Sequence, residues 1–207
     1  MKVNPAPLRT GQAALMGLCA ALSVATLGTS AHTLDIFNKQ QTSNPWWLPL
    51  WPQHFNVHGT KALVATSTVT FVLSAVFLVL ALVPRFNLTP TVRALLGLGT
   101  ILPSSLLALV TIVYAHILNS DSPEQDTIQT WTCKYKNSQP MEEEFRLPSE
   151  MGNGAFKSIC MESKFALYGT LVVFLLLGMS MLLTIVTWLA DKWAARQSRK
   201  EVEMTAH

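Results

Sequence analysis

The chain alternates long apolar runs with shorter polar segments. Four runs contain no Asp, Glu, Lys or Arg, and they cover residues 11–31, 62–83, 94–118 and 165–190. Uncharged runs of about 18 residues or more match the thickness of the hydrocarbon core of a bilayer. Water-soluble elements instead alternate apolar and polar positions at periods of about 2 or 3.6. The pattern therefore predicts four membrane-spanning segments.

These segments are too long and too uniform for the strands of a membrane barrel, which have about ten residues of alternating polarity. A helix satisfies its backbone hydrogen bonds within one segment, as lipid requires. We therefore expect an all-α fold, an integral membrane four-helix bundle. Composition agrees, because 50% of the residues are hydrophobic and 13% are charged, against roughly 25% charged in soluble proteins.

Basic residues predict the orientation of the bundle. If the N-terminus is cytosolic, the cytosolic segments are 1–10, 84–93 and 191–207, and the outer loops are 32–61 and 119–164. The cytosolic segments then hold eight Lys and Arg and three acidic residues. The outer loops hold seven Lys and Arg and nine acidic residues, spread over about twice as many positions, so the density of basic residues is higher in the cytosolic segments. Since basic residues near short loops stay in the cytosol, both termini are predicted to be cytosolic, with the plasma membrane as the expected location.

The first run admits a second interpretation. Lys2 and Arg9 precede it and residues 29–31 (Thr-Ser-Ala) end it, which is the layout of a signal peptide with a small-residue cleavage site. The apolar stretch from Ala13 to Ala31 is longer than the usual signal core of about 7 to 15 residues. Its length favours a retained helix, and cleavage after Ala31 stays open as the alternative.

Cysteine usage points to the second outer loop. Cys133 and Cys160 are the cysteines outside the apolar runs, and both fall in this loop. Because the outer compartment is oxidising, we expect a disulfide that closes a small outer loop. Closing about 28 residues restricts the unfolded chain by roughly 3.5 kcal/mol in the loop-entropy model. Cys19 lies in the first run and is expected to be a small buried hydrophobic residue.

Two further features suggest contact surfaces. Small residues recur every four positions in the first run, with Gly17, Ala21 and Ala25 at the centre; such a stripe lets another helix approach closely, although Ala-rich helices also produce it by chance. Residues 45–52 (Pro-Trp-Trp-Leu-Pro-Leu-Trp-Pro) form an aromatic segment of the first outer loop. Its tryptophans, Trp46, Trp47 and Trp51, are predicted to anchor the loop at the membrane surface or, alternatively, to contact a partner.

Candidate chemistry is sparse. Apart from His116 at an edge, the four runs contain no acidic, basic or histidine residue. Intramembrane charges usually mark ion paths or proton relays, so a pump is not expected. The sequence also lacks G-x-S-x-G, H-E-x-x-H and phosphate-loop motifs. We therefore expect no catalytic residue, no cofactor, no metal and no nucleic-acid partner.

The third run contains Pro103 followed by Ser104 and Ser105. Proline removes one helical hydrogen bond, and the serines or a neighbouring helix can satisfy the freed carbonyl of the predicted kink. In an oligomer these serines could line a polar path. The sequence therefore carries an alternative hypothesis of a small oligomeric channel or transporter.

A family resemblance rests on two short segments. Residues 130–133 (Thr-Trp-Thr-Cys), with Cys160 followed by residues 165–168 (Phe-Ala-Leu-Tyr), resemble four-span membrane proteins of filamentous fungi. In layout the whole chain is similar to the tetraspan group that includes tetraspanins, claudins and MARVEL-type proteins. It lacks the Cys-Cys-Gly signature of tetraspanins and the G-L-W motif of claudins. The resemblance implies scaffolding or junctional roles by analogy alone.

Together these features predict a non-enzymatic membrane organiser, scaffold or accessory subunit. Its expected partners are the lipid bilayer and either a membrane protein or further copies of this chain. A lipid-modifying enzyme has no motif in its favour.

Overall fold

The computed structural model describes residues 6–42, 51–52, 55–83, 89–122, 124–138 and 152–205. Four long helices dominate it, which confirms the predicted all-α bundle. In chain order the elements are α1 (Ala6–Thr42), β1 (Phe55–Asn56), α2 (His58–Leu82), α3 (Pro90–Ser120), β2 (Asp126–Thr127), α4 (Ile128–Tyr135) and α6 (Phe156–Thr205).

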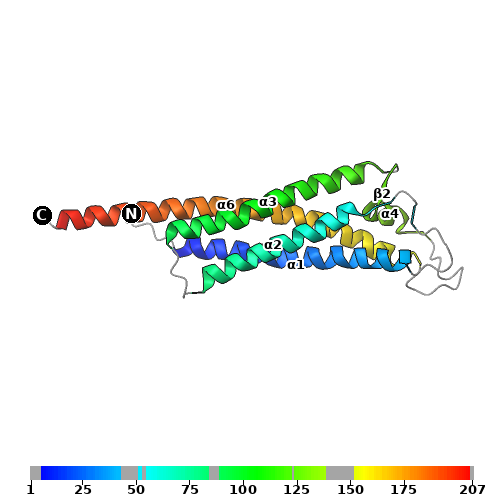
Figure 1. Cartoon of the computed structure of the whole chain (residues 1–207), viewed down its shortest axis with the longest axis horizontal. Helices are drawn as coiled ribbons and strands as arrows, with labels where there is room; N and C mark the ends of the chain where they lie inside the picture. Colours follow the sequence, from blue (N-terminus) through cyan, green and yellow to red (C-terminus); the bar gives the residue numbers. More distant parts are fainter. Residues whose placement is uncertain are drawn as a thin grey trace.

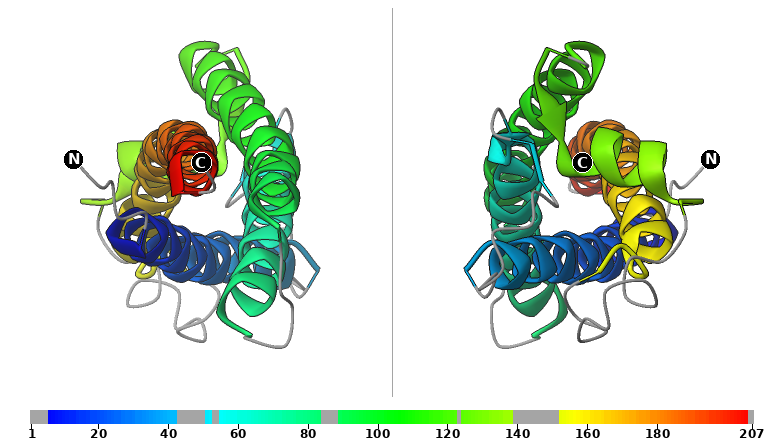
Figure 2. Two further views of the ribbon diagram at one scale, coloured as in Figure 1. Left: turned by 90° about the vertical axis from the view of Figure 1, so that its left-hand side faces the viewer. Right: turned by 90° about the vertical axis from the view of Figure 1, so that its right-hand side faces the viewer.

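The long helices form an elongated antiparallel bundle (Figure 1). α1 packs against α2 and α6, and α3 packs against the same two helices, so the four surround one interior (Figure 2). α1 begins and α6 ends at the same end of the bundle, which we call the terminal end. The short elements β1, β2 and α4 lie at the opposite end, the lobe end.

Each predicted apolar run coincides with one helix, apart from Val83, which directly follows α2, and the helices are longer than the runs. α6 has 50 residues, which corresponds to about 75 Å at 1.5 Å per residue, against roughly 30 Å for the hydrocarbon core of a bilayer. α1 continues to Thr42 through charged residues, and Asp35 and Lys39 form an ion pair of 2.8 Å one turn apart. Hydropathy assigned residues 32–42 and 156–164 to outer loops, but both segments are helical. Local ion pairs and packing extend a helix beyond its apolar run.

Local signals explain where two of the helices begin. The Thr89 hydroxyl accepts a hydrogen bond from the backbone N–H of Val92 at 3.4 Å, and Pro90 occupies the first helical position of α3. Both features favour a helix start, since proline has no N–H to leave unpaired and fixes φ near its helical value. The Asn56 side chain similarly accepts from the His58 N–H at 2.9 Å, where α2 begins.

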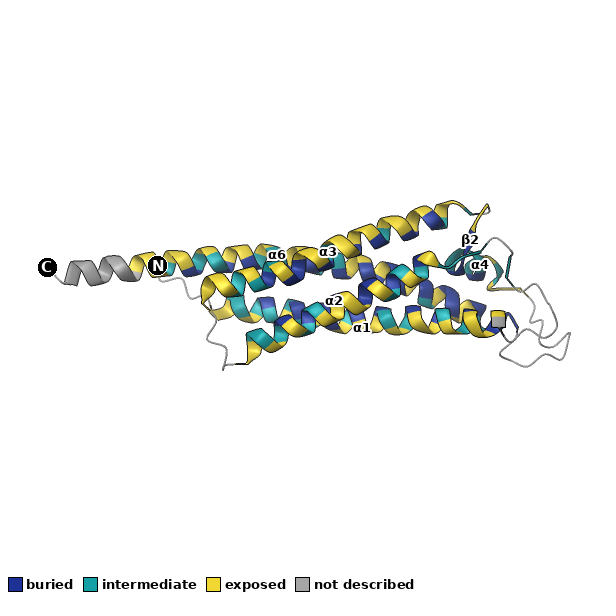
Figure 3. Ribbon diagram, viewed as in Figure 1, coloured by how far each residue is buried: buried dark blue, intermediate teal, exposed yellow. Residues whose placement is uncertain are grey.

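The four long helices expose one side and bury the other (Figure 3), and the exposed side is largely apolar, unlike that of a soluble protein. Large apolar side chains such as Val79, Leu106 and Leu182 are about 60% exposed on the outer surface, at 58%, 62% and 65%. Many buried side chains are hydroxyls instead. These buried hydroxyls are Ser23, Thr26, Ser30, Thr33, Thr66, Ser67, Thr70, Ser74, Thr100, Ser104, Thr111, Ser163, Thr170, Ser180, Thr184 and Thr187. An apolar exterior around a partly polar interior is the arrangement that lipid favours, and the four helices are long and apolar enough to cross a membrane. The structure is that of a helical membrane protein.

Hydrogen bonds between hydroxyls join neighbouring helices. Thr26 on α1 and Ser67 on α2 lie 3.0 Å apart, oxygen to oxygen, and Thr66 on α2 and Thr111 on α3 lie 2.6 Å apart. Other buried hydroxyls donate to the carbonyl four residues earlier, as Thr170 does to Ala166 at 2.8 Å. These bonds keep polar groups satisfied away from water, and they fix which turn of one helix faces which turn of the next.

An apolar cluster fills the interior toward the terminal end. It consists of Met16, Cys19, Phe77, Ile101, Val173 and Leu177. Each of these side chains is at most 3% exposed, and all four long helices contribute. Cys19 is buried and free, as expected for a small hydrophobic residue. A chain cleaved after Ala31 would lose Met16 and Cys19 from this cluster, together with most of one wall of the bundle.

Two glycines allow the closest helix contacts. A Cβ on Gly169 of α6 would lie 2.5 Å from Cγ2 of Thr26 on α1, a distance that real side chains do not tolerate. A Cβ on Gly97 of α3 would lie 3.1 Å from Cγ2 of Thr184 and 3.2 Å from Nε2 of Gln12. Small residues at these positions let the backbones approach, which is how helices associate in lipid.

We expect Gly169→Val to lower the free energy of unfolding by about 2 kcal/mol or more, because overpacking a well-packed interior costs roughly 1–3 kcal/mol. Gly178→Val is the matched control, since a Cβ on Gly178 meets nothing within 4 Å. Both changes place valine in the same helix, so their intrinsic helix preferences cancel. Unfolding in SDS or by steric trapping measures the difference, and equal losses for the two variants would contradict the packing of α1 against α6.

The Thr66–Thr111 bond can be measured by a double-mutant cycle with Thr66→Val and Thr111→Val. We expect a coupling free energy of about 0.6 kcal/mol, and no more than about 1.7 kcal/mol, the range found for hydrogen bonds between membrane helices. Thr68→Val serves as control, because Thr68 is exposed on the same helix and bonds its own Val64 carbonyl. A coupling energy of zero would show that the two hydroxyls do not interact.

Candidate functional site

The lobe end carries the most elaborate local structure. β1 and β2 form a short parallel pair in which Phe55 faces Asp126 and Asn56 faces Thr127. α4 follows β2 directly and packs against α6. Thr127 caps α4, since its hydroxyl accepts from the Thr130 backbone N–H at 3.2 Å while the Thr130 hydroxyl accepts from the Thr127 N–H at 2.9 Å. We call β1, β2, α4 and the helix ends beneath them the lobe.

A disulfide ties the lobe to the bundle, as the sequence predicted. It joins Cys133 on α4 to Cys160 on α6, which are 27 positions apart in the sequence and have Cα atoms 4.9 Å apart. The bond restrains α4 against the first turns of α6, where Phe156 and Ile159 are buried. The lobe is therefore held by a covalent link in addition to its packing.

An aromatic cluster forms the interior of the lobe. Trp51 contacts the rings of Phe37, Phe55 and Phe156 at centroid distances of 5.0, 5.0 and 5.3 Å. Its indole N–H donates to Oε1 of Gln40 at 3.1 Å. The structure thus places Trp51 inside the lobe, where it joins the chain before α2 to the extended end of α1. Trp46 and Trp47 lie outside the described residues, so the anchoring or partner role of the segment stays a prediction.

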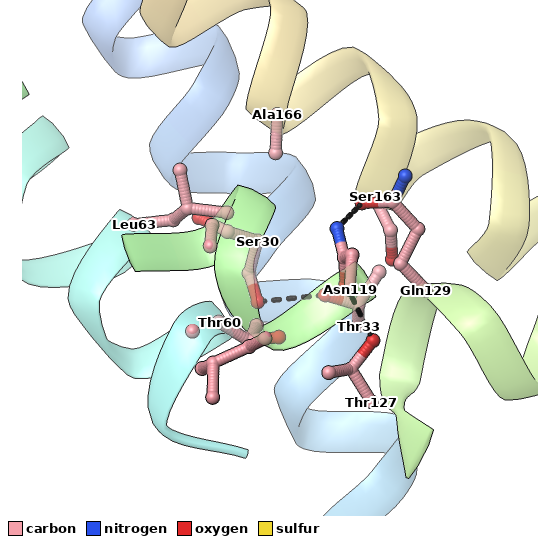
Figure 4. A pocket seen from close by; sticks show the side chains of 12 residues that line it. Ser30, Thr33, Thr60, Leu63, Asn119, Thr127, Gln129, Ser163 and Ala166 are labelled. Atoms are coloured by element: carbon pink, nitrogen blue, oxygen red, sulfur yellow. Dashed lines mark hydrogen bonds between the residues drawn. The ribbon is translucent and has the colours of Figure 1, made fainter. Parts of the chain in front are cut away.

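A small polar cavity lies between the lobe and the bundle (Figure 4). Asn119 crosses it, donating to Oε1 of Gln129 at 3.1 Å and accepting from the Thr127 hydroxyl at 2.7 Å. The cavity of about 20 Å³ is also lined by Thr33 and by Ser163, whose buried hydroxyl has no hydrogen-bond partner among the described residues. That space suits about one water molecule, which could satisfy Ser163.

The terminal end carries a second polar group of side chains. Arg9 on α1 donates from Nη2 to Oδ1 of Asp191 on α6 at 2.8 Å, with the Asp191 side chain 6% exposed and that of Arg9 40% exposed. One turn further in, the Gln12 side-chain amide donates to the Thr184 hydroxyl at 2.6 Å. Polar contacts therefore lock α1 to α6 where the bundle opens toward water.

A cavity of about 210 Å³ adjoins this group, between α1, α2 and α3. Arg9 and Gln12 line it from α1, and Arg93 lines it from α3. Phe77 and Leu82 of α2 form an apolar wall. Two guanidinium groups, those of Arg9 and Arg93, therefore lie in the lining of one cavity.

The small-residue stripe of the first run does not face the interior. Ala21 and Ala25 are exposed, and a Cβ on Gly17 would meet nothing within 4 Å. The side of α1 that packs inside the chain is rotated away and carries Ser23 and Thr26. Contact of the stripe with a helix of another molecule stays a prediction.

Pro103 is exposed on the outer surface of α3, and the helix continues through it to Ser120. Ser104 points inward, is fully buried and donates to the Thr100 carbonyl at 2.8 Å. Ser105 is half-buried. None of these three residues lines the cavity beneath the lobe or the cavity beside Arg93.

Sequence reasoning missed the charged group at the terminal end and the pairs of buried hydroxyls. A signal for the hydroxyls was present, since Ser23, Thr26, Ser30 and Thr33 recur at intervals of three and four and mark one helix face. Asp191 directly follows the fourth apolar run, where an acidic residue close to lipid calls for a partner. No comparable local signal identifies Arg9 as that partner, because 182 positions separate the two residues.

No family model, curated protein or solved structure matches the chain. The class of helical multi-pass membrane protein therefore rests on the fold itself, with its apolar exterior and four long helices. The resemblance to four-span proteins of filamentous fungi and to the wider tetraspan group stays a prediction.

Replacing both disulfide cysteines, in Cys133→Ala with Cys160→Ala, should lower the stability of the lobe by up to roughly 3.5 kcal/mol, the loop-entropy value for about 28 residues. Denaturant unfolding in detergent, followed by tryptophan fluorescence, measures the loss. Cys19→Ala is the control for mobility on a nonreducing gel, since Cys19 is free and should leave the disulfide band unchanged. A double variant as stable as the wild type would show that packing alone holds α4 in place.

Proposed function

We propose that the chain is a non-enzymatic membrane organiser, scaffold or accessory subunit, which acts through its outer helix faces and its lobe. We place both termini in the cytosol, following the distribution of basic residues, and we propose the plasma membrane as the location. The proposal takes a membrane-protein partner or a further copy of the chain as the binding partner.

The observation that carries this proposal is the filled interior of the bundle. Hydroxyl pairs such as Thr26–Ser67 and Thr66–Thr111 close the space between helices, and an apolar cluster follows toward the terminal end. The cavity beneath the lobe has room for about one water molecule. Two larger cavities lie toward the terminal end, one beside Arg93 and the other between α3 and α6. This packing favours a role that uses surfaces over one that uses a central path.

Two surfaces suit such a role. The lobe is restrained by the Cys133–Cys160 disulfide and by aromatic packing, so it can present a fixed shape beyond the helices. On α1, Ala21 and Ala25 are exposed small residues within the apolar run, where a helix of another molecule can approach closely. A preformed surface binds with less loss of conformational freedom than a flexible one.

A channel or transporter is the second candidate, and one observation favours it. Ser23, Thr70, Ser74 and Ser180 have buried hydroxyl oxygens without a hydrogen-bond partner among the described residues. Unsatisfied hydroxyls in the interior could contact water or a polar solute in a more open state. Flux through liposomes that contain the purified chain tests this option. A wild-type flux above background that falls in Ser104→Leu would favour it over the organiser.

For the organiser we expect Ala21→Leu combined with Ala25→Leu to reduce association in membranes by about tenfold, since bulky side chains prevent close helix contact. Chemical crosslinking in native membranes followed by native mass spectrometry measures the complexes. Gly178→Leu is the matched control, because it also adds leucine to an exposed position of a membrane helix and meets no neighbour within 4 Å. Recovery of a lone monomer from wild-type membranes, without any associated protein, would contradict the proposal.

A further inference from the structure

The organiser role does not explain the size and the positive charge of the cavity beside Arg9 and Arg93. The cavity measures about 210 Å³ and lies between three helices at the terminal end. A cavity of this volume has room for several water molecules. The space therefore exceeds a packing defect and can hold a small polar group.

The charges around this cavity are unbalanced. Arg9 is paired with Asp191 at 2.8 Å, whereas no described residue forms an ion pair with Arg93. Arg93 is repelled by Arg9 and attracted by Asp191, so the three groups interact. Two guanidinium groups thus share one carboxylate, which leaves one positive charge at the edge of the membrane.

Both arginines also have unused hydrogen-bond donors. The Nε atoms of Arg9 and Arg93 are buried and have no hydrogen-bond partner among the described residues. A buried donor without a hydrogen-bond partner is destabilising. Most buried donors in proteins therefore have a partner. An acceptor that carries negative charge and several oxygens would satisfy both donors and the excess charge together. The planar guanidinium group suits phosphate oxygens in particular.

The remaining wall and the position of the cavity narrow the source of such a group. Phe77, Ala81 and Leu82 of α2 form an apolar wall, and Leu82 is 66% exposed on the outer surface. α2 ends at Leu82 and α3 begins at Pro90, so the cavity lies within about two turns of these helix ends. Lipid phosphates lie at this boundary, directly above the acyl chains that Leu82 would contact.

We propose that this cavity binds the phosphate group of an anionic phospholipid, held by Arg93 and Arg9, with the lipid chain against the α2 wall. Basic pockets between membrane helices bind anionic headgroups in this way. The inference is independent of the organiser role, because it concerns lipid at the terminal end and not a protein at the lobe or on α1.

The test uses the full chain in nanodiscs of phosphatidylcholine that contain phosphatidic acid, phosphatidylserine or phosphatidylglycerol. Native mass spectrometry after gentle release of the nanodisc measures which lipids remain bound. We expect wild type to retain anionic lipid and Arg93→Gln to bind it at least about tenfold more weakly, since a hydrogen bond to a charged group is worth about this much in affinity. Arg93→Lys, which keeps the charge and loses the planar fork, should fall between the two.

Arg196→Gln is the matched control, because it removes one positive charge from an exposed position near the same end of α6. It should bind anionic lipid within about twofold of wild type, since exposed charges act weakly through water. The proposal is overturned if Arg93→Gln retains lipid as wild type does, if Arg196→Gln loses as much, or if wild type does not prefer anionic lipid. Circular dichroism and gel filtration test whether Arg93→Gln is folded. If it is not folded, the binding of anionic lipid by Arg93→Lys tests the proposal instead.

A phosphate group in the cavity could belong to a lipid or to free inorganic phosphate, and competition with inorganic phosphate distinguishes the two. Added to nanodiscs at increasing concentration, it should displace the lipid only at high concentration, because it lacks the contact with Phe77 and Leu82. Displacement at an affinity equal to that of the lipid would overturn the lipid as the occupant and would favour free phosphate.

Discussion

The structure depends on one constraint: polar groups within the spanning helices must be satisfied by the protein, since lipid offers them no partner. Most of the inward-facing serines and threonines meet this constraint through hydrogen bonds, whereas Ser23, Thr70, Ser74 and Ser180 have no partner among the described residues. In pairs such as Thr66–Thr111, one hydroxyl donates to the oxygen of the other, and the bond joins two helices. The apolar side chains that a soluble protein would bury face outward instead, as Leu106 and Leu182 do.

The same constraint sets how closely the helices approach. A hydroxyl is short, so Thr26 and Ser67 can bond only when the two backbones lie near each other. Gly169 permits that approach on the α6 side of Thr26, where a side chain would collide with its methyl group. Hydrogen bonding and close packing therefore support each other, and neither alone would fix the relative position of α1, α2 and α6.

Beyond the spanning region, water can satisfy polar and charged groups, so the constraint set by lipid no longer applies. There α1 and α6 continue as helices that carry charges, and their ends support the lobe through Phe37, Phe156 and the disulfide. At the terminal end, Asp191 is held by Arg9, and Arg93 faces the cavity. The two ends differ in kind: one is rigid and aromatic, and the other is charged and open.

The sequence by itself determined the four helices, the all-α class and the pairing of Cys133 with Cys160. The helices follow from the sequence because the free energy of transfer into lipid depends on the composition of a run. The disulfide follows because Cys133 and Cys160 are the cysteines outside the apolar runs. Tertiary structure decided which of two candidate faces of α1 is inside, since the sequence contains both the stripe of small residues and a row of hydroxyls. Periodicity suggested that Ala21 and Ala25 mark a packing face, yet the hydroxyls of Ser23 and Thr26 turn inward and leave the alanines outside. The tertiary structure also decided that Arg9 contacts Asp191, because residues so distant in the sequence come together only when the helices pack.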